Sequence, residues 1–293
     1  MKTRYLQQNV GESMSFRRLR ELLVLAASLV ACVSCAGTDE KPGTVATVST
    51  DEEEEAHGGV QWVLTAAEFE ALCLQAYRAA SDFLEASISD TDWSALPGQA
   101  NSSELPPAII FDIDETTLSN AEFQATYVPP FTNSKLDDWS NATVAQALPG
   151  AVDFARQAQA AGVELFFITN RPCEPKAGVD HPCPQEQVTL QDLNEAGIVT
   201  DADHVLLANE RPEWDREKVV RRKLIAQSYR VIMLIGDDLS DFIECTRSSP
   251  RAPCSNNATI ASRHEATYDH RSYWGAGWFI LPNPMHGSWT TVK

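Results

Sequence analysis

An apolar run that ends in two carboxylates, Ala108-Ile109-Ile110-Phe111-Asp112-Ile113-Asp114-Glu115-Thr116-Thr117, is the most informative part of this chain. Side chains alternate along a β-strand, so residues two apart point the same way. Asp112 and Asp114 are therefore expected to emerge together at the end of a buried strand. Two carboxylates so close can share a divalent cation, or divide the roles of nucleophile and proton donor. Such pairs are also common in loops after strands, so the interpretation depends on the rest of the chain.

Short apolar runs alternate with amphipathic segments along the chain. Strands are predicted at 108–113, 163–168, 204–208, 231–235 and 278–281. Helices are predicted from a capping box at residues 65–68 to about residue 86, between Gly150 and Gly162, at 187–196 and at 215–228. This alternation predicts an α/β protein, with a Rossmann-like parallel sheet and helices on both faces. The aromatic insertion 119–148 and the N-terminal helix are expected to form a small cap.

Four polar residues stand at or just beyond the ends of predicted strands: Asp112, Asp114, Thr169 and Asp237. Open parallel sheets bind ligands beyond the carboxyl ends of their strands. Transfer of a phosphoryl group needs an in-line nucleophile, a proton source for the leaving oxygen, and positive charge around the phosphate. The shared position of these residues indicates such a site.

The acids and the threonine suit separate steps of that reaction. Asp112 can attack phosphorus and form an aspartyl phosphate. Asp114 can protonate the leaving alkoxide and then deprotonate water, if its surroundings raise its pKa. Thr169 offers a hydroxyl donor to a phosphate oxygen.

Positive charge and a metal ion would complete the site. Lys218 can place an ammonium group beside the phosphate, a role for which Arg221, Arg222 and Lys223 compete. Asp237 can complete the oxygen ligands of a hard cation, for which Mg²⁺ is the best candidate, and Asp241 can hold a metal-bound water.

The ordered motifs resemble those of the haloacid dehalogenase (HAD) superfamily: Asp112-x-Asp114-x-Thr116, Thr169, Lys218 and Gly236-Asp237-x-x-x-Asp241. Within it, the chain resembles the class C acid phosphatases, the lipoprotein branch of subclass IIIB, over residues 62–289. Matching segments include Thr169-Asn170-Arg171 and the tail 281–287. The resemblance implies Asp112 as nucleophile and Asp114 as acid and base.

The resemblance also implies a Mg²⁺ site and substrate contacts. The metal ligands would be the Asp112 carboxylate, the Asp114 backbone carbonyl and Asp237, with Asp241 holding a ligand water. The candidate substrate-binding residues are Asn170, Arg171 and His286. Arg171 is equally suited to a structural ion pair. His286 stands where relatives often have tyrosine, so no leaving-group preference is carried over.

The N-terminal region reads as an export signal. Three arginines, Arg17, Arg18 and Arg20, precede an apolar run that is too short to span a bilayer stably. The run closes on Leu29-Val30-Ala31-Cys32, which resembles a bacterial lipobox. We predict a signal peptide at 1–31, a lipid anchor at Cys32, an acidic flexible tether at 32–60 and the phosphatase domain at 61–293. A plain secretory signal cut after Cys35 or Ala36 is the alternative, and Met14 is an alternative start.

The net charge of the chain limits its possible partners, and its cysteines indicate the compartment in which it folds. Without residues 1–31, the chain keeps 18 Lys and Arg against 39 Asp and Glu, a net charge of −21. This charge argues against nucleic acid and an anionic lipid surface as partners. Export favours disulfides, which we predict at Cys173–Cys183 and Cys245–Cys254, with Cys73 as a buried free thiol. A zinc site is the alternative for the paired cysteines. We rank it below disulfides because the cysteine spacings are too wide for a zinc knuckle.

Together these features predict an exported phosphomonoesterase, anchored by lipid to a bacterial membrane. By resemblance to the family, we expect the outer membrane as its destination, on the periplasmic or surface side. The expected substrates are nucleoside 5′-monophosphates and other small organic phosphates. Two alternatives stay open: a phosphotransferase that uses the same site, and a catalytically silent binding protein of the same fold.

Overall fold

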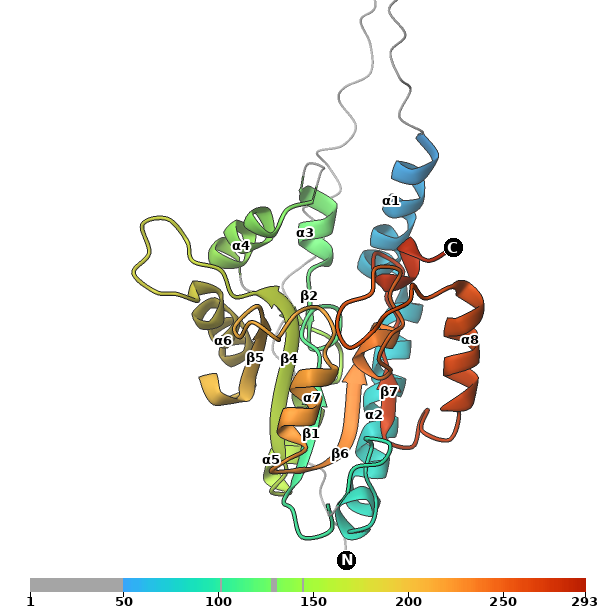
Figure 1. The fold of residues 1–293 in the computed structure, drawn as a ribbon. Helices are drawn as coiled ribbons and strands as arrows, with labels where there is room; N and C mark the ends of the chain where they lie inside the picture. The colour runs from blue at the N-terminus through green and yellow to red at the C-terminus, as the bar shows by residue number, and fades with distance from the viewer. Residues whose placement is uncertain (1–49, 101, 128–130, 144) are drawn as a thin grey trace, which may run out of the picture. The chain divides into compact units, whose positions relative to one another are not determined.

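The computed structural model describes residues 50–100, 102–127, 131–143 and 145–293, without the side chains of 50–57 (Figure 1). The predicted signal peptide, Cys32 and the first part of the tether lie outside the described residues and stay predictions. Among the helices that are described, none combines the length and the apolar character that a membrane span requires.

A five-stranded parallel sheet forms the centre of the domain (Figure 1). Its order is β5 (Val205–Ala208), β4 (Glu164–Pro172), β1 (Pro107–Phe111), β6 (Arg230–Gly236) and β7 (Trp278–Ile280). Phe111 at the end of β1 pairs with Phe167 on one side and Ile235 on the other. The residues that follow these positions therefore meet at one edge of the sheet, as the sequence predicted.

Alternating side chains of β1 enter two separate cores. Ile109 and Phe111 join the core on one face, whereas Ala108 and Ile110 join the core on the other. Helices α2 (Ala67–Ser89) and α5 (Ala151–Ala160) cover the first face, and α7 (Val219–Ile225) and α8 (Ile260–Asp269) the second (Figure 1). Helix α6 (Pro184–Ala196) packs beside β5. The predicted α/β fold with helices on both faces is confirmed.

The beginning of the domain differs from the prediction. Thr65 ends a helix of its own, α1 (Thr50–Thr65), and its hydroxyl donates to the Gln61 carbonyl at 2.7 Å. Helix α2 starts after Ala66 without a side-chain cap, so the predicted capping box does not form. Helix α1 takes in residues 50–60 of the predicted tether. Its last turns become part of the domain because Val60, Trp62 and Val63 pack into the core, which the acidic composition of the segment did not indicate.

The basic helix is shorter than its sequence pattern. It spans only Val219–Ile225, and Lys218 stands immediately before its first residue. Short 3₁₀ turns at Ala202–His204, Leu239–Asp241 and Ser288–Thr291 complete the main body.

The insertion 119–148 is more regular than its composition indicated. It contains α3 (Ala121–Thr126) and α4 (Asn133–Ala142), and the strands β2 (Leu118–Ser119) and β3 (Gln146–Ala147) close its base as an antiparallel pair. Its aromatic rings contact one another: Phe123, Tyr127, Phe131 and Trp139. Helix α2, which we expected to contribute to the cap, lies on the sheet instead, and α1 contacts α3.

The predicted cysteine chemistry is confirmed. Cys173 bonds to Cys183, and Cys245 to Cys254. Cys73 is a buried free thiol in α2. Both disulfides close short loops, which restricts the unfolded chain.

Candidate active site

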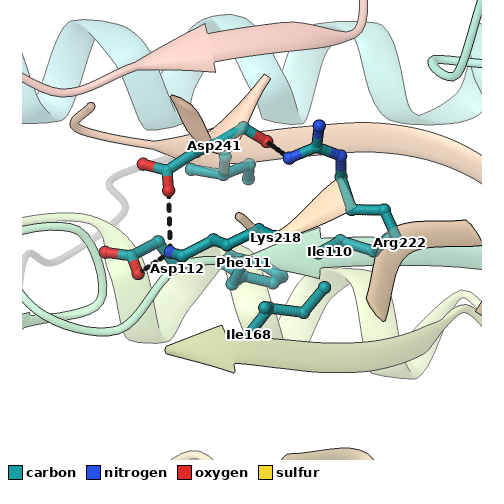
Figure 2. Close-up of a pocket in the computed structure, with 8 residues that line it drawn as sticks. Ile110, Phe111, Asp112, Ile168, Lys218, Arg222 and Asp241 are labelled. Carbon is teal, nitrogen blue, oxygen red and sulfur yellow. Dashed lines mark hydrogen bonds and ion pairs between the residues drawn. The ribbon is translucent and has the colours of Figure 1, made fainter. Parts of the chain in front are cut away.

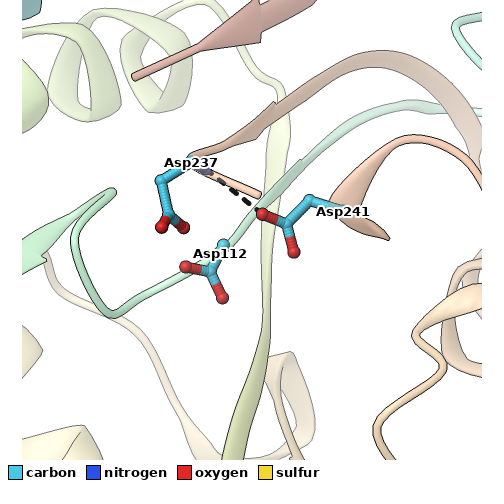
Figure 3. Close-up of side chains that lie close together, drawn as sticks. All are labelled: Asp112, Asp237 and Asp241. Atoms are coloured by element: carbon cyan, nitrogen blue, oxygen red, sulfur yellow. Dashed lines mark hydrogen bonds between the residues drawn. The ribbon is translucent and has the colours of Figure 1, made fainter. Parts of the chain in front are cut away.

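Three carboxylates from two strand ends converge at the edge of the sheet. Asp112 follows β1, Asp237 follows β6, and Asp241 lies in the turn after β6. One carboxylate oxygen from each lies within 4.8 Å of the others (Figure 3). Oxygens at this separation can bind one common cation, as the sequence analysis required.

The turn after β6 brings Asp241 back over the strand. Its Oδ2 accepts the backbone N–H of Asp237 at 3.2 Å and that of Asp238 at 3.0 Å. A Cβ on Gly236 would lie 2.4 Å from the same oxygen. Only glycine therefore leaves room for the carboxylate that holds the turn.

Lys218 joins two of the three carboxylates. Its Nζ contacts Asp112 Oδ1 and lies 2.7 Å from Asp241 Oδ1 (Figure 2). Burial alone would lower the pKa of Lys218, but the two carboxylates raise it above its ordinary value. The ammonium group therefore stays charged, although the side chain is only 3% exposed.

The acidic cluster holds more negative charge than Lys218 offsets. Burial raises the pKa of Asp112 to about 7, against the opposing effect of Lys218. Burial and the two neighbouring carboxylates raise the pKa of Asp237 well above its ordinary range. Buried carboxylates of this kind are normally paired or coordinate a metal ion. An all-oxygen donor set with this surplus charge suits a hard divalent cation.

Two side chains fix the carboxylate of Asp237. The hydroxyl of Thr116 donates to its Oδ1 at 3.2 Å, and the amide of Asn283 donates to its Oδ2 at 2.7 Å. Thr116 belongs to the first motif, whereas Asn283 lies in the C-terminal tail and had no predicted role. Its position within a segment shared with the family was the only signal for it.

Asp114 lies outside this cluster and has its own set of donors. Asn120 donates to it at 2.8 Å, Thr169 at 3.1 Å, and Arg171 through Nε at 2.9 Å. Burial would raise the pKa of Asp114, but Arg171 and the other donors hold it below its ordinary value. This shift is opposite to the one that we required for a proton donor. The shift is caused by the ion pair with Arg171, which forms only when segments distant in the sequence come together in the fold.

Arg171 bridges two carboxylates. Its Nη2 lies 2.9 Å from Asp114 Oδ1, and its Nη1 lies 2.9 Å from Asp192 Oδ2. The arginine is 6% exposed and Asp192 is 3% exposed. Of the two roles left open by the sequence, the structure shows the ion pair, and a contact with substrate stays a prediction. Asp192 in α6 carried no sequence signal.

The other basic residues near Lys218 bind backbone or face solvent. Arg221 donates to the Thr169 carbonyl at 2.6 Å and to the Asn170 side chain at 3.4 Å. Arg222 donates to the Asp241 carbonyl at 2.7 Å. The side chain of Lys223 is 68% exposed. Of these four residues, Lys218 is the one that reaches the carboxylate cluster.

His286 lies beside the site and pairs with a residue that the sequence analysis missed. Its Nε2 is 2.8 Å from Oε2 of the buried Glu115. Burial would lower the pKa of His286, but Glu115 raises it. Oε1 of Glu115 accepts the backbone N–H of Asn120 at 2.8 Å. Glu115 therefore links His286 to the loop that carries Asn120, a donor to Asp114.

A cavity of about 340 Å³ lies between α4 of the insertion and α6. Arg171 and Thr189 contribute to its wall, and Lys176 lines it from the loop after β4. Arg171 therefore lines this cavity and also pairs with Asp114.

The comparisons with known proteins agree with this fold. A sequence profile of the HAD superfamily, subfamily IIIB (acid phosphatase), matches residues 26–289. The chain belongs to this family, a class of phosphomonoesterases.

Solved structures of class C acid phosphatases are similar over most of the chain. The enzyme of Bacillus anthracis with tungstate bound has 29% identity and a TM-score of 0.63. A second structure of the enzyme from that organism has 30% identity and a TM-score of 0.62. In both, the match covers 80% of this chain and 86% of the other.

Two plant proteins of Glycine max match a smaller part. The stem 31 kDa glycoprotein is 27% identical over 158 residues, which are 50% of this chain and 51% of that protein. The stem 28 kDa glycoprotein is 28% identical over 149 residues, which are 48% of this chain and 55% of that protein. The chain spans about half the length of these curated relatives.

Asp238, the neighbour of Asp237, is a buried structural group. Its carboxylate accepts bonds from Ser240 N at 2.9 Å and from the hydroxyl of Ser288 at 2.8 Å, which ties β6 to the C-terminal turn. Burial would raise the pKa of Asp238, but Arg247 and these donors hold it at about 2.

Asp238→Asn is expected to make the protein's stability less dependent on pH. Because the folded-state pKa is depressed, the carboxylate stabilises the fold above its ordinary pKa near 3.8, and this contribution disappears as the pH falls through about 2. At pH 7 the variant should lose roughly 2 kcal/mol of unfolding free energy, and the difference should shrink toward pH 2. Urea unfolding in chelator, with the exposed Asp269→Asn as control, measures both. An undiminished difference at pH 2 would contradict the assignment.

Proposed function

We propose that this chain is a Mg²⁺-dependent phosphomonoesterase that works through an aspartyl phosphate on Asp112. The observation that carries the proposal is the cluster of Asp112, Asp237 and Asp241, closed on one side by Lys218. It combines a nucleophile, a fixed positive charge and a cation site at one sheet edge. Membership in the acid phosphatase family supports the same reaction.

In the first half-reaction, an oxygen of Asp112 forms a bond to phosphorus while the bond from phosphorus to the leaving oxygen breaks. Lys218 supplies positive charge beside the nucleophile, where the charge of the phosphoryl oxygens accumulates. A bound Mg²⁺, held by Asp112, Asp237 and the Asp114 backbone carbonyl with Asp241 beside them, would polarise those oxygens. The carboxylates fit such an ion because one oxygen from each of the three converges on one place, where Lys218 supplies a single positive charge.

Asp114 exchanges protons with the leaving group and with water. In the first step, the protonated fraction of Asp114 gives its proton to the leaving alkoxide, and this fraction grows as the pH falls, because Arg171 lowers the pKa of Asp114. In the second step, water attacks phosphorus, passes a proton to Asp114 and releases phosphate from Asp112. The ionised form favoured by Arg171 suits this second step. Asn120 and Thr169 keep the carboxylate oriented.

The substrates that we propose are nucleoside 5′-monophosphates and other small organic phosphates. The bound tungstate of the B. anthracis enzyme supports an oxyanion site, because tungstate and phosphate are both tetrahedral oxyanions. The insertion 119–148 and His286 stand near the strand ends where a leaving group would lie. A hydrolysis screen over a panel of monophosphates measures this preference.

The variant Asp112→Asn tests whether the protein is an enzyme or a catalytically silent binding protein. The amide keeps the shape of the side chain but cannot attack phosphorus, so we expect phosphatase activity to fall by about a thousandfold or more. Phosphate release from a monophosphate measures it, and far-UV circular dichroism checks the fold. Equal activity of the variant and the wild type would refute the nucleophile assignment.

The phosphotransferase alternative shares the first half-reaction. An alcohol would then replace water in the attack on the aspartyl phosphate. In the presence of an alcohol acceptor, the ratio of transferred to free phosphate distinguishes the two activities.

Removal of divalent metal is expected to abolish turnover, because no cation would then neutralise the phosphate oxygens or favour the ionised form of Asp112. Excess chelator followed by added Mg²⁺ tests this, and we expect activity to return with Mg²⁺. Full activity in excess chelator would overturn the metal assignment.

The location that we propose is the outer membrane of a bacterium, with the chain anchored by lipid on Cys32. The lipobox at residues 29–32 supports this, as do two disulfides, which form in oxidising compartments. The wild type should sediment with membranes on expression in a bacterium, and Cys32→Ser should not be lipidated. A wild type that is soluble in the periplasm would favour the plain secretory signal.

A further inference from the structure

The loop 281–287, here called the tail loop, makes two contacts with the active site. Asn283 donates its amide to Asp237 at 2.7 Å, and His286 lies 2.8 Å from Glu115. The side-chain oxygen of Asn283 also accepts the backbone N–H of Met285 at 3.0 Å, which folds the loop on itself. The position of this loop therefore sets the position of both side chains.

Helix α1 touches the backbone of the tail loop. A Cβ built on Gly59 would lie 2.2 Å from the Pro284 carbonyl oxygen and 3.2 Å from Met285 Cα. The contact is one of backbone against backbone, and no larger side chain fits it without moving the loop. Met285 and Val63 of α1 belong to the same buried core.

A glycine inside helix α1 destabilises the helix, so its presence there calls for a packing reason. Inside a helix it is less favourable than alanine by about 1 kcal/mol. Gly59 has a packing reason in the Pro284 carbonyl. The preceding residue, Gly58, has none, because a Cβ there meets nothing within 4 Å. The chain thus supplies its own control one residue away.

We infer that α1 is a positioning element of the active site, and that Gly59 is the residue through which it sets the tail loop. Loss of the close contact moves Asn283 away from Asp237 and weakens the hold on the cation-binding carboxylate. The inference rests on the proposed metal-dependent function, to which it adds Gly59 as a positioning residue.

The test compares Gly59→Ala with Gly58→Ala. Mg²⁺ affinity is measured by titration calorimetry on the substrate-free protein, and by the Mg²⁺ concentration that gives half-maximal phosphate release. We expect Gly59→Ala to bind Mg²⁺ about tenfold more weakly, as for other changes to groups that orient metal ligands. Gly58→Ala should bind Mg²⁺ as the wild type does, with a melting temperature equal or higher. Equal affinity of the two variants would overturn the inference.

A double variant shows whether the effect passes through Asn283. Asn283→Ala should weaken Mg²⁺ binding by itself, and Gly59→Ala should add little in that background, because residues that act in one chain are not additive. Full additivity would place the effect of Gly59 elsewhere and refute the stated route.

A second pair of variants covers the case in which Gly59→Ala does not fold. Val63 is 9% exposed and anchors α1 in the core, whereas the adjacent Leu64 is 46% exposed. Val63→Ala should weaken Mg²⁺ binding in the same direction, and Leu64→Ala should not. Equal affinity in this pair would also overturn the inference. A wild type without Mg²⁺ binding or phosphatase activity would instead refute the proposed function.

Discussion

Three carboxylates and one lysine meet at the edge of the sheet, so the site holds more acidic than basic groups. Asp112 and Asp241 are buried and Asp237 is half-buried, and the ammonium group of Lys218 touches Asp112 and Asp241. Such a cluster destabilises the metal-free protein, because like charges repel at low dielectric. Three features stabilise the cluster: the surrounding hydrogen-bond donors, the glycine at position 236 and the backbone hydrogen bonds to Asp241.

The two aspartates of the first motif have opposite environments, although they leave the same strand. Burial raises the pKa of Asp112, whereas Arg171 lowers that of Asp114. These shifts favour the protonated form of Asp112 and the ionised form of Asp114, the reverse of what a nucleophile and a proton donor need in the first step. A bound cation would lower the pKa of Asp112, and acidic pH would protonate Asp114. The two environments differ because Asp112 lies beside Lys218 and the acid cluster, whereas Asp114 lies beside the Arg171–Asp192 pair.

Segments at the two ends of the described chain support the site together. Helix α1 lies against the tail loop through Gly59 and against α3 of the insertion. The tail loop in turn holds Asp237 through Asn283. A segment whose acidic start resembles a linker thereby supports the tail loop, because its last turns bury Val63 in the same core as Met285.

The parallel sheet, the strand ends that precede Asp112 and Asp237, and the two disulfides could be predicted from the sequence, because periodicity and short spacing are local properties. Lys218 could also be selected among four basic residues. The strand that carries Thr169 extends further than predicted, to Pro172. The contacts of Arg171, Asn283 and Glu115, and the direction of the Asp114 pKa shift, could not be predicted. These depend on partners far apart in the chain, such as Asp192 and Asp237, whose approach is set by packing and not by any local pattern.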